Sequence, residues 1–212
     1  VASGPTVLDV THKDDAAQIL ARYGFNGRVA LSETPKKSCY FEKVRNIVVL
    51  ENTAALQAMA EKAKALGLEP IIRTNGLTGE ARKAGQILLG NIQPGQAVLA
   101  AGETTVTVTG QGQGGRNQEF VLGALAHLQP GDIIASVGSD GWDNGDAAGA
   151  IADFNSLARA RALNLDPAKC LADNDSRRFF EPLGDLIITG HTGSNVSDLM
   201  CAIRFTSLTS IS

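Results

Sequence analysis

The sequence of 212 residues is poor in the residues that build metal and disulfide sites. Its three cysteines are odd in number and form no Cys-x-x-Cys pair, and its three histidines show no metal-ligand spacing. A disulfide framework and a zinc site are therefore not expected, and the cytoplasm is the compartment that this cysteine usage favours.

Long apolar runs and clusters of basic charge are also missing. No apolar stretch approaches the roughly 20 residues of a membrane span, and we do not expect a signal peptide. Basic residues come at most in pairs and the net charge is −3, so we expect neither a membrane nor a nucleic acid as a partner. The G-x-x-x-x-G-K motif of P-loop ATPases is absent as well.

What the sequence does contain is typical of an α/β protein. Hydrophobic residues make up 43% and charged residues 19%, which is enough to bury a core. Apolar strand patterns and amphipathic helix patterns alternate in the first half, and this order predicts a three-layer structure with a mostly parallel sheet under helices. The predicted elements there are a strand at 46–50, a helix at 54–66, a strand at 69–73 and a helix from Thr78.

The pattern changes after Gly95, where we place a boundary between residues 1–95 and a smaller, mixed-sheet domain at 96–212. Residues 103–109 alternate threonine and valine, the period of a strand with one buried face. The other elements predicted here are strands at 97–101, 132–137 and 185–189, helices at 117–128, 155–163 and 175–182, and a final segment at 195–205.

Four segments rich in glycine and polar residues follow predicted strands. They are Gly102–Thr105, Gly114–Glu119, Ser139–Asp146 and Thr189–Asn195. Each alone is also typical of a turn. Ligands of open α/β sheets bind beyond the carboxyl ends of strands, so we expect the four segments to line one crevice.

The second of these segments completes a G-x-G-x-x-G pattern with Gly110, Gly112 and Gly115, which is formally a dinucleotide-binding motif. The strand predicted before it is only half apolar, however, and the helix after it starts with four polar residues. We prefer another interpretation, in which the backbone of the glycine-rich turn and the N-terminus of the following helix bind an anion. Their N–H groups and the side chain of Arg116 would face that anion. Arginine suits this task because it binds phosphate or carboxylate with two parallel hydrogen bonds, although Arg116 in a salt bridge remains the alternative.

The third segment repeats aspartate at Asp140, Asp143 and Asp146. Asp140 and Asp143 are oxygen ligands suited to Mg²⁺, Asp140 is alternatively a general base, and an Asp-rich turn is the remaining interpretation. Glu103 is placed to orient Arg116 or to bind a ligand. Thr192, Gly193 and Asn195 offer hydroxyl and N–H groups to an anion.

Taken in order, these four segments resemble the MOFRL domain of the two-domain glycerate 2-kinases, a family also labelled hydroxypyruvate reductase. The motifs are Gly102-Glu-Thr-Thr, Gly114-Gly-Arg-Asn-Gln-Glu, Ser139-Asp-Gly-Trp-Asp and Thr189-Gly-His-Thr-Gly-Ser-Asn. Ala2–Thr6 and Glu33–Pro35 resemble the larger domain of the same family, so the resemblance covers about residues 1–205.

The resemblance implies transfer of the γ-phosphoryl group of ATP, with Mg²⁺, to the C2 hydroxyl of glycerate, giving 2-phosphoglycerate. It implies catalytic roles for Arg116 and Asp140, with Asp140 and Asp143 as metal ligands. The implied substrate or nucleotide contacts are Glu103, Thr104, Gly114, Gly115, Asn117, Thr192, Gly193 and Asn195. The resemblance leaves a homodimer open.

The chain opens with Val1 inside a motif of that family and without an initiator methionine, so we expect the C-terminal half of such an enzyme. The nucleotide-binding domain that precedes this half in the family would then be missing, and we expect the chain to be inactive alone. Two other readings stay open. One is an NAD(P)H-dependent hydroxypyruvate reductase, in which Asp140 holds the ribose hydroxyls, and the other is a small-molecule-binding fragment without activity.

Overall fold

The computed structural model describes residues 6–206 and forms two compact units, with the boundary between Val49 and Leu50. The Ala2–Thr6 motif lies, except for Thr6, outside the described residues. The boundary predicted near residue 95 falls inside the second unit, and as a domain boundary it stays a prediction.

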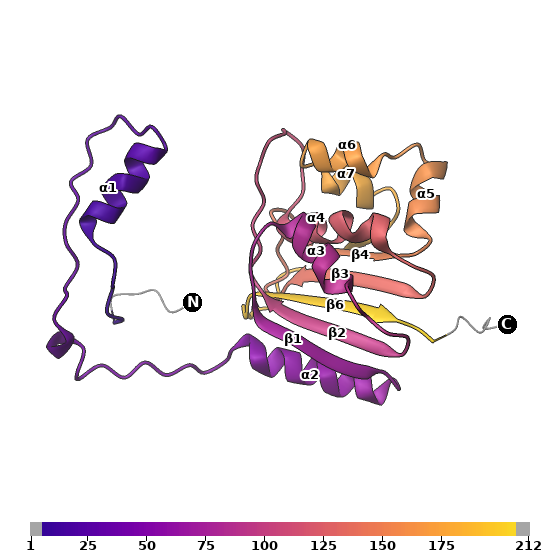
Figure 1. Cartoon of the computed structure of the whole chain (residues 1–212), viewed down its shortest axis with the longest axis horizontal. Helices are drawn as coiled ribbons and strands as arrows, with labels where there is room; N and C mark the ends of the chain where they lie inside the picture. The colour runs from indigo at the N-terminus through magenta and orange to yellow at the C-terminus, as the bar shows by residue number, and fades with distance from the viewer. Residues whose placement is uncertain (1–5, 207–212) are drawn as a thin grey trace. The chain divides into compact units, whose positions relative to one another are not determined.

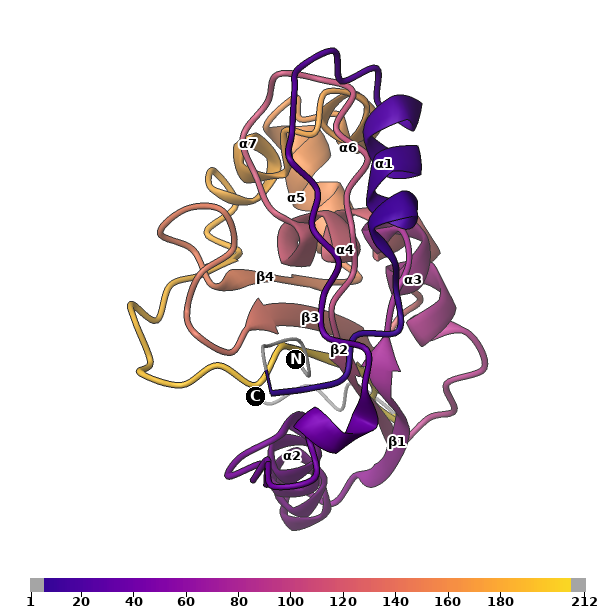
Figure 2. The same ribbon diagram turned by 90° about the vertical axis from the view of Figure 1, so that its left-hand side faces the viewer.

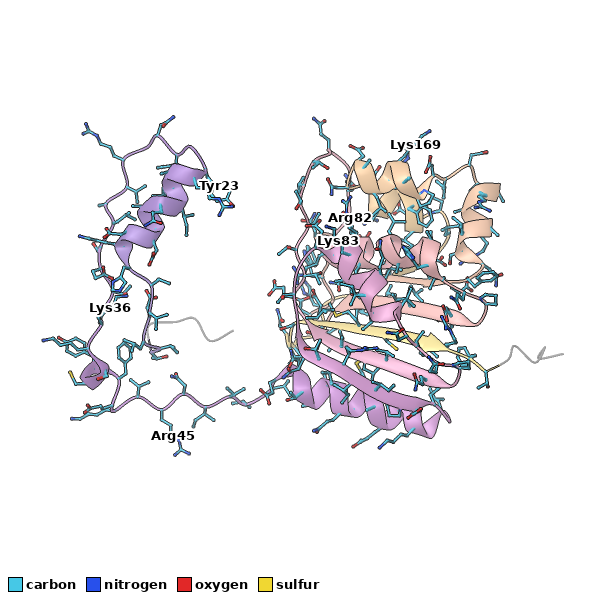
Figure 3. The ribbon with its side chains drawn as sticks, viewed as in Figure 1. Tyr23, Lys36, Arg45, Arg82, Lys83 and Lys169 are labelled. Carbon is cyan, nitrogen blue, oxygen red and sulfur yellow. The ribbon has the colours of Figure 1, made fainter. Side chains whose placement is uncertain are left out.

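The first unit has little structure of its own. It contains the helix α1 (Lys13–Arg22) and the short 3₁₀ helix η1 (Ser38–Tyr40), and none of its described residues is buried (Figure 1). Lys36, labelled in Figure 3, connects the segment before α1 with the segment before η1. Its Nζ donates to the Asp9 carbonyl at 2.9 Å and to Thr34 Oγ1 at 2.6 Å.

The strand predicted at 46–50 is not formed. A strand needs a neighbour for its backbone groups, and none of the described strands pairs with this segment. Its apolar side chains are consequently exposed, and Val49 is 92% exposed.

The second unit is built on one six-stranded sheet in the order β1-β2-β6-β3-β4-β5 (Figure 1). The strands are β1 (Glu69–Leu77), β2 (Gln96–Gly102), β3 (Asp132–Gly138), β4 (Gly149–Asp153), β5 (Leu186–Ile187) and β6 (Asp198–Arg204). Only β1 and β2 are parallel, and the other four pairings are antiparallel. The predicted α/β class and mixed sheet are confirmed, and parallel pairing is confined to the first pair of strands.

Helices cover both faces of this sheet and make three layers, as predicted (Figure 2). One face carries α2 (Asn52–Ala65), which packs on β1 and β2. The other face carries α3 (Ala81–Leu89), α4 (Arg116–Ala124) with η2 (Leu125–His127), α5 (Ser156–Ala162), α6 (Pro167–Ala172) and α7 (Ser176–Phe180). The larger apolar cluster lies on this second face and includes the fully buried Phe120, Phe179, Phe180 and Met200.

Residues 103–109 differ most from the sequence prediction, because they form a loop with a single β-bridge between Thr105 and Glu80. Side chains take the place of a neighbouring strand. The Glu80 carboxylate accepts hydrogen bonds from Thr107 N at 3.1 Å and Thr107 Oγ1 at 2.9 Å. Asn174 Oδ1 accepts from Thr109 N at 2.7 Å and from Gly110 N at 2.9 Å. The G-x-G-x-x-G pattern therefore follows a loop, and its dinucleotide-binding interpretation loses the preceding strand that it needs.

Smaller corrections concern the limits of elements. The helix predicted from Thr78 starts at Ala81, and the strand predicted at 185–189 is reduced to Leu186–Ile187. Helix α6 was not predicted at all, although Asp166-Pro167 is a start signal: the Asp166 carboxylate accepts from Ala168 N at 3.0 Å and Lys169 N at 3.3 Å.

Candidate functional site

The sheet brings three of its strand ends together at one edge. Gly102 at the end of β2 pairs with Asp198 at the start of β6, and Asp198 pairs with Gly138 at the end of β3. Because β6 is antiparallel to both neighbours, the segments after β2 and β3 and the segment before β6 leave the sheet at the same edge. The structure thus places polar segments that are far apart in the sequence around one end of the sheet.

A pocket of 540 Å³ opens between the loop that follows β2 and the start of α4. Six of the predicted site residues line it, namely Glu103, Thr104, Gly114, Gly115, Arg116 and Asp143. Thr104 is 2% exposed, and its Oγ1 has no hydrogen-bond partner among residues 6–206. A buried hydroxyl without a partner is costly, and this one belongs to a residue that lines the pocket.

Arg116, the first residue of α4, is oriented by Asp198. Its Nε lies 2.6 Å from Oδ2 and its Nη2 lies 2.9 Å from Oδ1 of that carboxylate. Asp198 is 1% exposed, and this hydrogen bond raises the pKa of Arg116 and keeps it charged. The remaining nitrogen, Nη1, lies 3.6 Å from Glu103 Oε1, whose side chain is 59% exposed. The salt bridge considered from the sequence therefore exists, and it leaves the Nη1 side of the guanidinium to the pocket.

The N-terminus of α4 does not offer its first amides to a ligand, in contrast to the sequence interpretation. Asp143 is 3% exposed and accepts hydrogen bonds from the backbone N–H groups of Asn117 and Gln118, both at 3.0 Å. The side-chain amides of the same two residues donate to this carboxylate at 3.2 Å. Burial raises the pKa of Asp143 and outweighs the lowering by these donors. An internal carboxylate occupies the place that was predicted for an external anion.

Two predicted roles change as a consequence. Both carboxylate oxygens of Asp143 accept hydrogen bonds from α4, so Asp143 could bind a metal ion only if these bonds were broken. Asn117 is fully buried, and its Oδ1 accepts from Ser136 Oγ at 2.5 Å, so it holds the interior together and does not face the pocket. A side chain at Gly115 would overlap Asp143, which explains why glycine precedes the helix.

The remaining predicted residues form a second group beside the pocket, outside its lining. Asp140 Oδ2 accepts from Asn195 Nδ2 at 3.1 Å, and Asp140 Oδ1 accepts from Trp142 N at 3.0 Å. Thr192 donates from Oγ1 to the Ser139 carbonyl at 2.5 Å and from N to the Asp140 carbonyl at 3.2 Å. These bonds join the segment after β3 to the segment before β6, and Gly193 lies in the latter.

An aromatic pair adds to this junction. The rings of Trp142 and His191 are stacked, with centroids 5.2 Å apart and an angle of 12° between their planes. Within the described part of the chain, no three histidine, cysteine or acidic side chains come together in a way that could hold a metal ion. The predicted site residues therefore lie in two neighbouring groups, one around Arg116 and one around Asp140.

Sequence reasoning missed the residues that hold these groups in place. Asp198 was not singled out, although a carboxylate that opens an otherwise apolar strand is unusual and needs a partner. Glu119 is 2% exposed and binds Arg82 of α3 (Figure 3), with 2.8 Å between Oε1 and Nε. Its other oxygen, Oε2, accepts from Asn174 Nδ2 at 3.1 Å, which ties the pocket loop to α4.

Residues 96–198 match the model of the MOFRL family. The match spans all four polar segments, and it confirms the resemblance predicted from them. Among the described residues, no helix is long and apolar enough to cross a membrane.

Relatives of the whole chain are consistent with this family. The chain is 36% identical to a D-glycerate 2-kinase of Thermotoga maritima over 96% of this chain and 52% of the relative. A crystal structure of a glycerate kinase from the same organism superposes with a TM-score of 0.75 at 33% identity, covering 92% of this chain and 51% of that one. A protein of Agrobacterium vitis with hydroxypyruvate reductase in its name is 37% identical, over 94% of this chain and 50% of the relative. The chain spans about half the length of these relatives.

Proposed function

We propose that this chain forms part of an ATP-dependent glycerate kinase, which transfers the γ-phosphoryl group of ATP to the C2 hydroxyl of glycerate and yields 2-phosphoglycerate. The observation that carries the proposal is the pocket lined by Arg116, whose guanidinium Asp198 holds in one orientation. A positive, planar donor group in a pocket suits an oxyanion such as a carboxylate or a phosphoryl group. The names of the kinase relatives support the same reaction.

In this proposal, the chain contributes positioning and charge stabilisation. Arg116 binds the carboxylate of glycerate or the phosphoryl group and neutralises charge as it shifts between the reacting oxygens. Glu103 and Thr104 complete the contacts in the pocket, together with the backbone at Gly114 and Gly115. Asp140 accepts the proton of the attacking hydroxyl or binds the metal, Asn195 and Thr192 hold it in place, and Gly193 offers its N–H group to the substrate.

Magnesium is the metal that this chemistry implies, because it neutralises the phosphate oxygens. Mg²⁺ is bound by one or two carboxylates plus phosphate oxygens, so a full cage of protein ligands is not needed. Asp140 is only half-buried and fits that pattern as a single ligand, whereas Asp143 is occupied by α4. We therefore keep Asp140 alone in the proposed metal site.

We further propose the larger assembly in which the chain works. Residues 1–95 belong to the larger domain of the enzyme and residues 96–212 to the MOFRL domain. The nucleotide-binding domain of the family supplies the opposite wall of the active site. The cytoplasm is the proposed compartment, since it provides ATP and suits a chain whose cysteines form no framework.

The test of this proposal uses the intact gene product and two variants. Wild type is assayed with ATP and glycerate and, separately, with NADH and hydroxypyruvate. Arg116→Lys keeps the charge but loses the two-pronged grip, so kcat for glycerate phosphorylation should fall by on the order of a hundredfold, with a smaller change in KM. Under the rival reductase function, wild type would oxidise NADH with hydroxypyruvate and would not phosphorylate glycerate.

Arg204→Lys is the matched control. Arg204 binds a buried aspartate, Asp132, with the same geometry, but at the other end of β6. We expect its kcat and KM to stay within about threefold of wild type. If Arg116→Lys also kept its activity, the pocket would not be the catalytic site.

A further inference from the structure

We propose that Asp198 is a positioning residue of the site, which turns the guanidinium of Arg116 so that one edge faces an oxyanion in the pocket. This inference rests on the proposed function for the identity of the reaction, but not for the geometry. Asp198 opens β6 at the sheet edge where β2 and β3 end, so a rigid strand between two neighbours fixes its carboxylate.

The hydrogen bonds define which edge of Arg116 is used. The Asp198 carboxylate accepts from Nε and Nη2, the two nitrogens that form one edge of the planar guanidinium group. Nη1 remains, with Glu103 at 3.6 Å, beyond ordinary hydrogen-bond distance, as its neighbour. Because an arginine presents five N–H donors in a rigid fork, fixing one side fixes the direction of the other.

A second aspartate–arginine pair in the same sheet shows what a purely structural pair looks like. Asp132, also 1% exposed, binds Arg204 through Nε at 2.6 Å and Nη2 at 2.9 Å, the distances found for Asp198 and Arg116. In that pair, however, Nη1 of Arg204 donates to the Ile92 carbonyl at 2.9 Å, and Asp132 also accepts from Gln129 N at 2.8 Å. Arg204 also lines a pocket, of 220 Å³, but the protein binds its guanidinium on both sides. Arg116 is bound on one side, and its Nη1 has Glu103, at 3.6 Å, as its neighbour.

Because Asp198 is buried, it holds the guanidinium of Arg116 in one orientation. Its carboxylate is almost inaccessible, and within residues 6–206 Arg116 is its sole side-chain partner. Rotating the guanidinium away would leave a buried charge unpaired, which is strongly unfavourable. The Nε/Nη2 edge of Arg116 therefore stays on Asp198, and an oxyanion in the pocket must bind at the edge that carries Nη1.

The kinetic experiment compares Asp198→Asn with the matched variant Asp132→Asn in the intact gene product. Asp198→Asn should lower kcat/KM for glycerate phosphorylation by on the order of a hundredfold, mainly through kcat, because a small misplacement of a clamp is costly. Asp132→Asn should lower the melting temperature and leave kcat/KM within about threefold. Equal losses in the two variants, or wild-type kinetics in a folded Asp198→Asn, would overturn the inference. If Asp198→Asn does not fold, Asp198→Glu keeps the charge and displaces it, and unchanged kinetics in that variant would overturn the inference as well.

A second arm separates this inference from the proposed reaction. Inorganic phosphate is titrated into the 212-residue chain while the Arg116 Nε–H signal is followed by NMR and Trp142, the single tryptophan, by fluorescence. Positioning by Asp198 predicts phosphate binding at least tenfold weaker in Asp198→Asn, although that variant has lost one negative charge. If only net charge mattered, the variant would bind phosphate more tightly than wild type. Tighter or equal binding in the variant, or no response of Arg116 in wild type, would overturn the role of Asp198. Absence of kinase activity in the wild-type intact protein would refute only the proposed function.

Discussion

At the scale of single residues, the site depends on charged groups that are paired and buried to different degrees. Asp143 and Asp198 are almost inaccessible and bind inside the protein. Asp140 is half-buried, and among residues 6–206 its carboxylate accepts two hydrogen bonds. A carboxylate that keeps free lone pairs at the surface of a site can take a proton or a metal ion. Asp140 is therefore the acidic residue of this edge that is best suited to chemistry.

The role of Asp140 is tested by Asp140→Asn in the intact gene product. The variant keeps the size of the side chain but loses the charge, so kcat for glycerate phosphorylation should fall by about a hundredfold or more. Recovery of activity at raised Mg²⁺ concentration indicates a metal ligand, and lack of recovery indicates a general base. Under the reductase function, the same variant would instead weaken NADH binding.

Asp146→Asn is the control for this experiment. Asp146 lies in the same loop but forms an exposed ion pair with Arg177, so its loss should change kcat by less than about threefold. Kinase activity left intact in both variants would mean that the loop is a turn without a catalytic role.

At the scale of elements, the site depends on how closely α3 and α4 approach each other. Gly85 in α3 faces the Phe120 backbone of α4, and Gly123 in α4 faces the Arg82 backbone of α3, so each helix has a glycine where the other comes nearest. This contact fixes α4, whose first turn carries Arg116 and whose second residue pairs with Asp143.

Gly123→Ala should destabilise the 212-residue chain by about 2 kcal/mol, because its added methyl group would overlap the backbone of Arg82 and the backbone cannot move aside easily. The free energy of unfolding is measured by urea denaturation. Gly76→Ala serves as the control, since a methyl group at Gly76 has no neighbour within 4 Å, and its effect should stay within about 0.5 kcal/mol. Equal destabilisation by the two substitutions would show that the close approach of α3 and α4 does not determine the stability cost of Gly123→Ala.

At the scale of the whole molecule, our proposal assigns the opposite wall of the cleft to a further domain of the enzyme. The pocket around Arg116 is lined by residues of the second unit alone, and the chain spans about half the length of its kinase relatives. Aligning two substrates contributes a large part of the barrier reduction in such transfers, and it requires both walls of an active site.

We therefore expect the isolated 212-residue chain to fold cooperatively through its second unit but to convert neither ATP with glycerate nor NADH with hydroxypyruvate. Unfolding is followed by circular dichroism, and turnover is measured with coupled assays, with the intact gene product as positive control. Turnover dependent on ATP and glycerate, in a preparation free of the intact enzyme, would contradict this expectation.

Much of this architecture follows from the sequence by itself. The periodic helices and apolar strands define an α/β fold, because local hydrophobic patterns decide which faces are buried. The motif around Arg116 and the four polar segments identified the MOFRL resemblance, and the same segments mark the edge of the sheet where the pocket lies.

The tertiary structure decided which charges meet. Arg116 and Asp198 are 82 positions apart, Asn117 and Asp143 are 26 apart, and Asn174 binds the loop at Thr109 across 65 positions. A buried carboxylate must find donors, but strand order and register determine which donors are near, and local patterns contain neither. For that reason the sequence could name Arg116 and Asp143 as candidates, whereas only the fold could show that Arg116 pairs with Asp198 and that Asp143 binds the first turn of α4.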